Sequence, residues 1–234
     1  MKKKIFIFSH AMEIGGAERA LLGLLDSFDY SKYDIDLFLM RHSGELMSLI
    51  PNNVNILPLN RKYSSLAIPI VSVIKNGNFD IAAGRFIGKL KAQYFNKKMG
   101  YSDSGTELEY SHKYTERYMP MMSDKEYDLA ISFLTPHYYV ANKVNANKKI
   151  AWIHTDYSFI DIDVESELKM WSVYDNVISI SDDVTKVFLT KFPSLENRIK
   201  LIENILSKSN IKSQSELFNA KGELNGSINL LSIG

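Results

Sequence analysis

The chain of 234 residues contains no cysteine. This absence excludes disulfide bonds, thiolate catalysis and cysteine-based zinc sites, and it is compatible with a cytoplasmic protein. An excess of either charge is also lacking, because 28 Lys and Arg face 27 Asp and Glu for a formal net charge of +1. No overall field therefore favours nucleic acid as a partner, and any electrostatic function must be local.

Long hydrophobic runs are missing as well. The start MKKKIFIFSHAME resembles a signal peptide only briefly, because its apolar stretch ends after about five residues and is followed by Glu13. No run approaches the roughly 20 apolar residues that a membrane span requires. With 45% hydrophobic and 12% aromatic residues, the chain can nevertheless fill a core. We expect a globular cytoplasmic protein whose contact with a membrane, where there is one, is peripheral and at the inner face.

Short apolar runs alternate with helical patterns along most of the chain, and a polar residue closes each run. Strands are expected at 4–9, 33–40, 54–59, 127–133, 149–154 and 176–181. Helices are expected at 17–28, 45–50, 138–145, 164–171 and 183–192. This alternation predicts an α/β fold with a Rossmann-like, doubly wound, mostly parallel sheet and helices on both of its faces.

In such sheets, ligands bind at the carboxyl ends of the strands. That rule places residues 9–16, 133–137, 154–158 and 181–182 along one rim. The rim side chains that could contact a ligand are His10, His137, Asp156 and Ser181. Ser181 with Asp182 and Asp183 also fits an N-cap cluster for the helix that follows.

Gly15 and Gly16 lie between the first strand and the first helix. A helix N-terminus carries unpaired N–H groups and partial positive charge, and glycine lets an anion approach that backbone closely. The alternative is a tight turn that binds nothing. A dinucleotide fingerprint is absent, because Arg19 stands where a third glycine is needed and the second strand ends in Met40 rather than an acid. No P-loop occurs either.

His154 ends an expected strand and can reach a ligand at the rim. It could donate a hydrogen bond to a sugar hydroxyl or assist proton transfer, or it could be a satisfied surface histidine. The other histidines show no close metal-ligand spacing. The carboxylates of the Asp-x-Asp pairs 34/36 and 161/163 are of the type that can hold a divalent metal ion. We favour a structural role for both pairs, with Asp34 and Asp36 on the polar face of a strand and Asp161 and Asp163 as helix caps, so no metal site is predicted.

The alternation is interrupted between about residues 66 and 124, where a basic amphipathic helix is expected over 85–99. Its basic residues are Arg85, Lys89, Lys91, Lys97 and Lys98, with no acid among them. Phe86, Ile87, Leu90, Tyr94 and Met99 can share one stripe. Such a helix can lie on an anionic membrane or hold an anionic acceptor, but we favour a stripe packed on the core with solvated lysines.

The C-terminal segment divides at about residue 206. Residues 198–206 read as a strand and a turn, 207–226 as a helix with a linker, and 227–234 as an apolar strand. Because a strand without partners has no reason to end a domain, we expect residues 1–206 to form an N-terminal domain and residues 227–234 to begin a truncated second one.

Together these stretches resemble the N-terminal, acceptor-side domain of family 4 glycosyltransferases of the two-Rossmann (GT-B) type. The resemblance rests on the series GGAERALLGLL, WIHTD, NVISISDDV, KFPSLENRIKLIENIL and INLLSIG, and it leaves out about residues 66–124. It implies a retaining transfer of a hexose from a nucleotide sugar, without a metal or other cofactor, to a cell-surface polysaccharide or lipid-linked oligosaccharide.

The resemblance also assigns residues. Gly15 and Gly16 match the loop over the donor diphosphate, His154 matches the histidine that faces the transferred sugar, and Asn204 resembles an interdomain asparagine with a structural role. The partners would be the nucleotide sugar, a glycan or glycolipid acceptor, the missing C-terminal domain and the membrane surface next to the basic helix, so residues 1–234 alone should be inactive. Two alternatives remain: a non-catalytic Rossmann-like domain that binds a ligand or a protein, and another Rossmann enzyme with an unrecognised cofactor loop.

Overall fold

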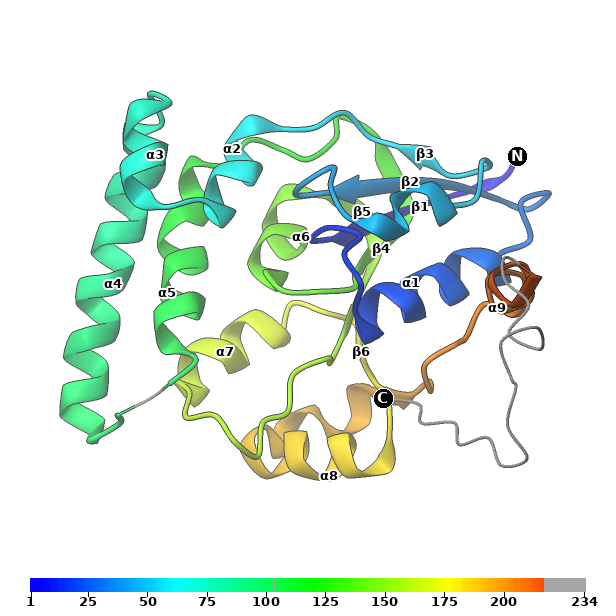
Figure 1. Ribbon diagram of the computed structural model, residues 1–234. Helices are drawn as coiled ribbons and strands as arrows, with labels where there is room; N and C mark the ends of the chain where they lie inside the picture. The colour runs from blue at the N-terminus through cyan, green and yellow to red at the C-terminus, as the bar shows by residue number, and fades with distance from the viewer. Residues whose placement is uncertain (103, 217–234) are drawn as a thin grey trace, which may run out of the picture.

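The computed structural model describes residues 1–102 and 104–216, in which one sheet is flanked by helices (Figure 1). The strands are β1 (Lys3–Ser9), β2 (Tyr33–Leu39), β3 (Asn55–Ile56), β4 (Glu126–Ser132), β5 (Asn145–Trp152), β6 (Asn176–Ser179) and β7 (Ile199–Leu201). They form a seven-stranded sheet in the order β3-β2-β1-β4-β5-β6-β7, and every pair is parallel. This is the order of a doubly wound α/β sheet, so the predicted fold class is confirmed.

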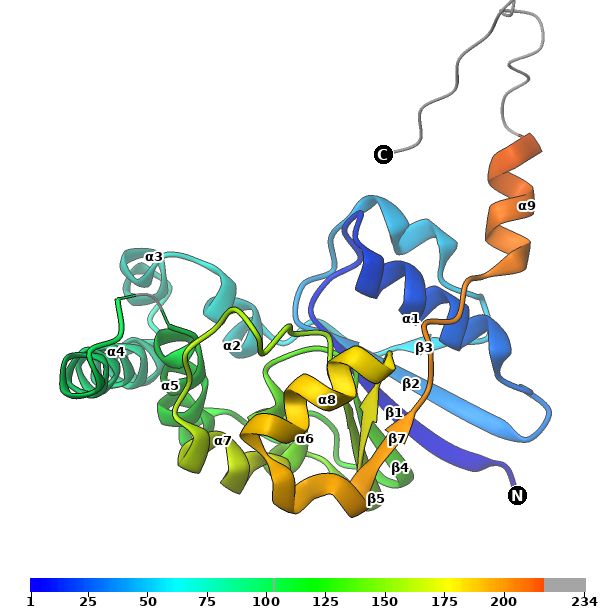
Figure 2. The same cartoon turned by 90° about the horizontal axis from the view of Figure 1, so that it is seen from below.

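Helices cover both faces of the sheet. They are α1 (Gly16–Ser27), η1 (Glu45–Leu49), α2 (Arg61–Ser64), η2 (Ser65–Ala67), α3 (Ile70–Lys75), α4 (Phe79–Met99), α5 (Thr106–Thr115), η3 (Glu116–Tyr118), α6 (His137–Lys143), α7 (Val164–Trp171), α8 (Asp182–Lys191), η4 (Pro193–Arg198) and α9 (Lys208–Glu216). Figure 2 shows α1 on one side of the strands, α6 and α8 on the other, and α3, α4 and α5 beside the sheet.

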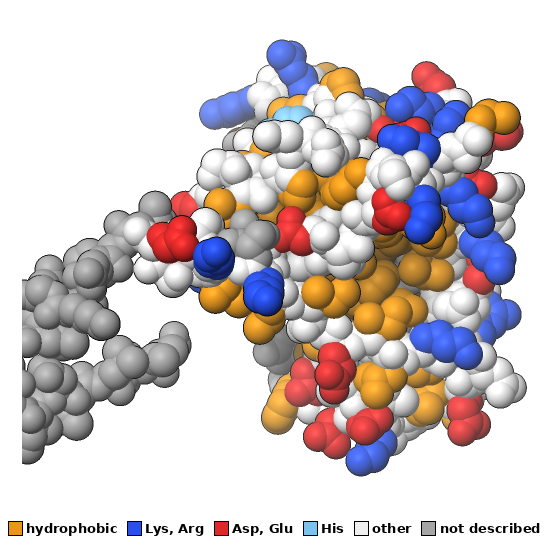
Figure 3. Space-filling model, turned by 90° about the vertical axis from the view of Figure 1, so that its right-hand side faces the viewer, with side chains coloured by type: hydrophobic (Ala, Val, Ile, Leu, Met, Phe, Trp, Pro, Cys, Tyr) orange, Lys and Arg blue, Asp and Glu red, His pale blue; other side chains and the backbone are white. Residues whose placement is uncertain are grey.

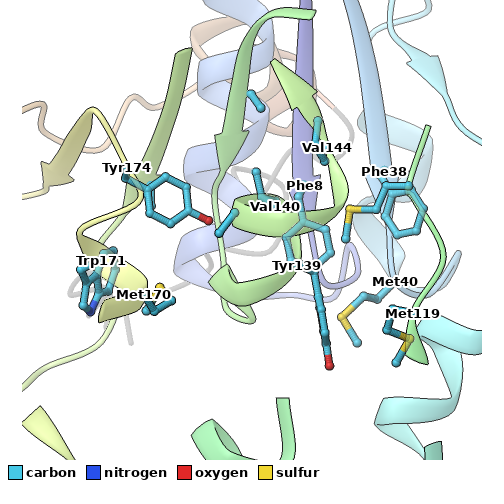
Figure 4. Packing of buried hydrophobic residues seen from close by; sticks show 14 of the residues in the cluster. Phe8, Phe38, Met40, Met119, Tyr139, Val140, Val144, Met170, Trp171 and Tyr174 are labelled. Atoms are coloured by element: carbon cyan, nitrogen blue, oxygen red, sulfur yellow. The ribbon is translucent and has the colours of Figure 1, made fainter. Parts of the chain in front are cut away.

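The sheet is buried on both faces because its strands are apolar at successive positions. In β1, Phe6 and Phe8 belong to one core cluster, while Ile5 and Ile7 belong to the cluster on the opposite face. The first cluster contains the rings and methionines drawn in Figure 4, where Tyr139 of α6 lies among side chains from several elements. Figure 3 shows the molecular surface on the right-hand side of Figure 1, where hydrophobic side chains gather in the middle and charged side chains lie around them.

The helix α4 packs against α5 through small residues. Its buried positions are Ile81, Ala82, Gly84, Gly88 and Ala92. A Cβ on Gly88 would lie 2.7 Å from the Tyr110 carbonyl oxygen, and one on Gly84 would lie 2.8 Å from the Tyr114 carbonyl oxygen. Only glycine permits this approach, so the face that α4 buries consists mainly of small residues, with Ile81 as the exception.

The expectation that the apolar stripe of the basic helix, now part of α4, packs on the core is therefore wrong. Phe86, Leu90 and Tyr94 are 56%, 50% and 72% exposed, and Ile87 and Met99 are exposed as well. The backbones of α4 and α5 are in contact at Gly84 and Gly88, which leaves no room there for a larger side chain, and Phe95 is the ring of α4 that packs on Tyr110 of α5. The helix consequently presents an apolar stripe to the surroundings rather than to the core.

Most element boundaries agree with the expected ranges. The expected strand 54–59 is reduced to Asn55–Ile56, and the expected strand 149–154 runs from Asn145 to Trp152. The helix expected after residue 207 is present as α9, while the rest of the expected linker and the strand at 227–234 lie outside the described residues.

Candidate functional site

The order of the strands reverses between β1 and β4, which are neighbours in the sheet but far apart in the chain. Chain connections leave to opposite sides at this point, so a crevice is expected beyond the carboxyl ends of these two strands. The loop from His10 to Gly15 follows β1, and the loop from Phe133 to Pro136 follows β4. Both belong to the predicted rim.

The β1–α1 loop is fixed by the loop that follows β2. The Met12 N–H donates to the Ser43 carbonyl at 2.9 Å, and the Met12 carbonyl accepts from the Leu46 N–H at 2.9 Å. Gly44 has a φ of 115°, and a Cβ there would overlap the Met12 carbonyl. Arg41 and Glu13 form an ion pair of 2.7 Å across the two loops. The backbone in front of α1 is thus held in place before any ligand arrives.

Gly15 is the N-cap of α1, and no side-chain hydrogen bond caps this helix. A Cβ on Gly16 would meet nothing within 4 Å, so the first turn is open on that side. A Cβ on Gly15 would overlap the carboxylate of Glu18, which lies back over the helix start. The sequence reasoning missed this carboxylate; a glutamate at N3 is its signal. A diphosphate bound at this N-terminus would have to compete with Glu18.

His154 lies two residues beyond β5, and its ring centroid is 4.7 Å from that of Phe133. Its Nε2 is buried and has no hydrogen-bond partner in the described residues. Burial lowers the pKa of His154 to about 4, so the imidazole is neutral at pH 7. A neutral ring with an unpaired nitrogen is suited to hydrogen bonding with a ligand and is a weak base.

Three further histidines form a chain of neighbours that begins at His154. Burial is the largest cause of the shift in His112 and in His137 and lowers the pKa of each to about 3. The positive charges of His154 and His112 would also lower the pKa of His137, and that of His10 would lower the pKa of His112. Burial followed by the charge of Arg41 lowers the pKa of His10. In residues 1–102 and 104–216, no His, Asp and Glu side chains are arranged as a metal site.

His137 begins α6 beyond the carboxyl end of β4, but it is not open to solvent. It is buried, its Nδ1 lies 2.8 Å from the Ser132 hydroxyl, and its ring centroid lies 4.6 Å from that of Trp171. These contacts fix the start of α6, and they are possible because only residues 133–136 separate β4 from α6. Its exposed edge is limited to the wall of a small cavity described below.

Ser181 and Asp156 have local partners. The Ser181 hydroxyl caps α8 by accepting from the Val184 N–H at 3.2 Å, as the N-cap interpretation predicted. Asp156 is exposed and accepts from the Ser158 N–H at 2.8 Å, which lowers its pKa together with the Ser158 hydroxyl. Neither side chain is brought against His154 by any interaction that the structure records.

The Asp-x-Asp pairs have structural roles, with two corrections. Asp163 caps α7 through the Ser166 N–H, whereas Asp161 contributes a backbone bridge to Ser104 and no cap. Asp34 is exposed as expected, but Asp36 is buried and accepts from Lys125, Tyr127 and Asn55. The strand β2 is covered on both faces, so a polar face was the wrong expectation.

A cavity of about 110 Å³ opens beside the carboxyl ends of β4 and β5. Its polar wall comes from Glu109 and His112 of α5, His137 and Tyr138 of α6, and Tyr157 and Glu167 near α7. The sequence analysis missed both glutamates. Glu109 and His112 are three residues apart and share one face of α5, which is the only sequence signal that connects them.

The basic residues of α4 differ in their surroundings. Arg85 is tied down, because its guanidinium donates to the carbonyl oxygens of Ile68 at 2.6 Å and Ser65 at 3.2 Å. The four lysines of α4 are exposed, and none is part of an ion pair in the described residues: Lys89, Lys91, Lys97 and Lys98.

Asn204, which resembled an interdomain asparagine, is exposed. Within the described ranges, helices sufficiently long and apolar to cross a bilayer are absent.

No protein-family model and no curated protein sequence matches the chain. Among solved structures, it is similar to Anabaena Alr3699/HepE in complex with UDP-glucose, with a TM-score of 0.47 and 13% identity over 92% of this chain and 49% of that one. For the same protein in complex with UDP and glucose, the values are 0.45 and 13%, over 92% and 50%. For TcCGT1 in complex with UDP, they are 0.40 and 9%, over 92% and 55%. The chain spans about half the length of these proteins.

Proposed function

We propose that the chain is the acceptor-side domain of a retaining glycosyltransferase that moves a hexose from a nucleotide sugar to a cell-surface polysaccharide or lipid-linked oligosaccharide. The observation that carries this proposal is the shared rim of the sheet. An open helix N-terminus at Gly16 and an unpaired imidazole nitrogen of His154 both lie at the carboxyl ends of the strands. The resemblance of GGAERALLGLL and WIHTD to family 4 supports the retaining class.

In this proposal the donor diphosphate binds at the first turn of α1. The N–H groups of that turn and the partial positive charge of the helix stabilise the leaving diphosphate, so no metal or cofactor is required. Gly15 and Gly16 keep the approach open, and the Glu18 carboxylate moves aside when the anion binds. His154 donates or accepts a hydrogen bond at the transferred sugar through Nε2.

A second domain is expected to supply the rest of the donor site. The experiment compares residues 1–234 with the full-length protein for release of nucleoside diphosphate from UDP-, GDP- and ADP-sugars in the presence of a lipid extract. We expect turnover by the full-length protein with at least one donor and none by residues 1–234. Turnover by residues 1–234 alone would contradict the two-domain arrangement. A full-length protein that binds sugar nucleotides or glycans without turnover would favour a non-catalytic binding domain.

We also propose that α4 holds the enzyme at an anionic membrane that carries a lipid-linked acceptor. Its exposed Phe86, Leu90 and Tyr94 can enter the lipid interface, while the four exposed lysines face phosphate headgroups. Each lysine near such a surface contributes about 1 kcal/mol. The proposed membrane contact is the face of α4 opposite α5.

Vesicle sedimentation tests this contact. We expect binding to vesicles that contain phosphatidylglycerol, weaker binding at high salt, and little binding to phosphatidylcholine alone. Replacing Lys89, Lys91, Lys97 and Lys98 with Glu should weaken binding at least roughly tenfold. The control replaces two exposed lysines outside α4, Lys148 and Lys200, with Glu. This variant should bind as the wild type does. Equal loss in both variants would remove α4 from the proposal.

A further inference from the structure

The cavity of about 110 Å³ is built by elements that are distant in the sequence. The helix α5 forms one wall, and the segments that follow β4 and β5 form the others, including Thr135 and Thr155. A water molecule occupies about 30 Å³ in the liquid, so the space corresponds to about four waters. It can hold a hydroxymethyl group or the edge of a sugar ring, but not a nucleotide.

Glu109 is one of the polar groups that line the cavity. It is 8% exposed, and its Oε1 accepts from the Ser166 hydroxyl at 2.7 Å and from the Tyr138 hydroxyl. Its Oε2 is buried and has no hydrogen-bond partner in the described residues. Leaving such an oxygen unpaired costs about 1–3 kcal/mol or more, so a ligand group that donates to Oε2 would recover this energy.

The rest of the wall disfavours an anion. Glu167 lies on the same cavity and accepts from the Tyr157 hydroxyl at 2.7 Å and from Trp171 Nε1 at 3.4 Å. The Lys113 ammonium, which could attract an anion, is bound to the Ser166 hydroxyl and is not part of the cavity wall. A phosphate would therefore face two glutamates without a cation.

The remaining lining suits a carbohydrate. Leu108, Ile160 and Met170 supply apolar surface, and Tyr138 and Tyr157 supply aromatic rings. The imidazoles of His112 and His137 complete the polar side, and burial lowers the pKa of each, so both are neutral at pH 7. Apolar C–H surface and a few fixed polar atoms are what the edge of a sugar ring requires.

We propose that this cavity is a subsite for a hydroxyl-bearing edge of a neutral sugar or polyol, whose O–H donates to Glu109 Oε2. The hydroxyl supplies the bond that Oε2 lacks, and the ring carbons contact Ile160 and Met170. Assigning the bound sugar to the acceptor rests on the proposed transfer reaction, but binding in the cavity does not. The donor diphosphate is excluded from this subsite and belongs at Gly16.

Methyl NMR on residues 1–234 tests the proposal with methyl α-D-glucopyranoside as the probe. We expect the Ile160 and Met170 methyl signals to shift in a saturable manner while that of Ile14, in the β1–α1 loop, stays unchanged. Inorganic phosphate should shift none of these signals. Shifts of Ile160 and Met170 with methylammonium but not with the glucoside would identify a cation site and overturn the proposal. Absence of any glucoside shift in the wild-type chain would overturn it as well.

Glu109→Gln keeps the size of the side chain but replaces one carboxyl oxygen with an NH₂ group, which donates a hydrogen bond instead of accepting one. It should weaken glucoside binding roughly tenfold or more, because a buried polar group is left without its partner. Glu107→Gln, an exposed position on the same helix, is the matched control and should bind as the wild type does. Unchanged affinity in Glu109→Gln would place the sugar elsewhere. Because these measurements involve no donor, glucoside binding by a full-length protein that transfers no sugar would refute only the transferase proposal.

Discussion

The imidazole of His154 lies against the phenyl ring of Phe133, with 4.7 Å between the ring centroids. The parallel register of β4 and β5, which pairs Ser132 with Ala151, brings these two residues together just beyond the strand ends. Phe133 is buried and helps to exclude water from the imidazole, which lowers the pKa of His154 to about 4. The same packing leaves Nε2 without a partner, so the histidine is preorganised for a ligand hydrogen bond.

We predict that His154→Ala in the full-length protein lowers kcat roughly 100-fold or more, which corresponds to about 2.7 kcal/mol of transition-state stabilisation. The physical reason is the loss of a hydrogen bond that strengthens as charge develops on the transferred sugar. Steady-state kinetics with whichever of the UDP-, GDP- and ADP-sugars supports turnover checks the value, and circular dichroism checks the fold. Near-normal kcat would remove His154 from the reaction and leave the fold assignment intact.

Asn60→Ala is the control for an effect of stability alone. Asn60 caps α2 by accepting from the Lys62 N–H at 3.0 Å, and loss of such a cap costs about 1 kcal/mol. We expect a lower Tm and an unchanged kcat for this variant, the reverse of the pattern for His154→Ala. A similar fall of kcat in both variants would show that the reaction responds to general loosening of the domain.

The open side of Gly16 allows a test of the donor position. A Cβ there meets nothing within 4 Å, so Gly16→Val should cost little stability. The added methyl groups would occupy the space through which an anion reaches the helix N-terminus, and we expect the donor KM to rise at least tenfold, about 1.4 kcal/mol. Donor kinetics in the full-length protein measures this effect. Unchanged kinetics would return Gly15 and Gly16 to the class of simple turn residues.

The contact between Gly88 and Tyr110 predicts that Gly88→Ala destabilises the protein, whereas helix propensity alone predicts stabilisation. In an exposed helix, Gly→Ala stabilises by up to about 1 kcal/mol. At Gly88 the new Cβ would lie 2.7 Å from the Tyr110 carbonyl oxygen, so Gly88→Ala should destabilise by about 1–3 kcal/mol. Urea unfolding of residues 1–234 checks the sign, with Gly16→Ala, where space is open, as the control. Stabilisation at Gly88 would mean that α4 and α5 are further apart.

The positions of most strands could be predicted because each strand carries its own signal. Runs such as KIFIFS and YDLAISF are buried on both faces, and the polar residue that closes each run marks the rim. His154 was found for this reason: it directly follows an apolar run. The boundary errors fall at β3, where little pairing is available to define an end, and at β5, whose first four residues (NANK, 145–148) have no apolar run that marks them as strand.

The buried face of α4 could not be predicted by the same reasoning. A stripe of large apolar residues normally marks the core side of a helix, but here Gly84 and Gly88 face α5 and the large residues face outward. Which face of α4 is buried depends on the helix that packs against it, and no pattern within the sequence of α4 identifies that helix. Glu109 was missed for a related reason, because α5 reaches the cavity only through the tertiary fold.

The buried carboxyl of Glu167 makes stability depend on pH. Burial, reinforced by the charges of Glu109 and Asp163, raises its pKa to about 7 against the hydrogen bonds from Tyr157 and Trp171. An acid whose pKa is raised by folding binds its proton more tightly in the native state. Its contribution to stability is therefore fully present below the ordinary glutamate pKa, about 4.3, and is lost as the pH rises through about 7.

We predict that Glu167→Gln removes this loss. Between pH 5 and pH 7.5, the stability of the wild type relative to Glu167→Gln should fall, by at most about 3 kcal/mol at 1.36 kcal/mol per pKa unit. The free energies of unfolding of the two proteins must be subtracted at each pH, because buried histidines also make stability depend on pH. Folding lowers the pKa of three of them, so they destabilise the native state of both proteins as the pH falls below about 6.5: His112, His137 and His154. Urea unfolding at each pH gives the two free energies. Glu165→Gln, exposed on the same helix and paired with Lys169, should track the wild type at every pH. A constant difference between wild type and Glu167→Gln would show that the Glu167 carboxyl is ionised throughout, with a pKa near that of an exposed glutamate.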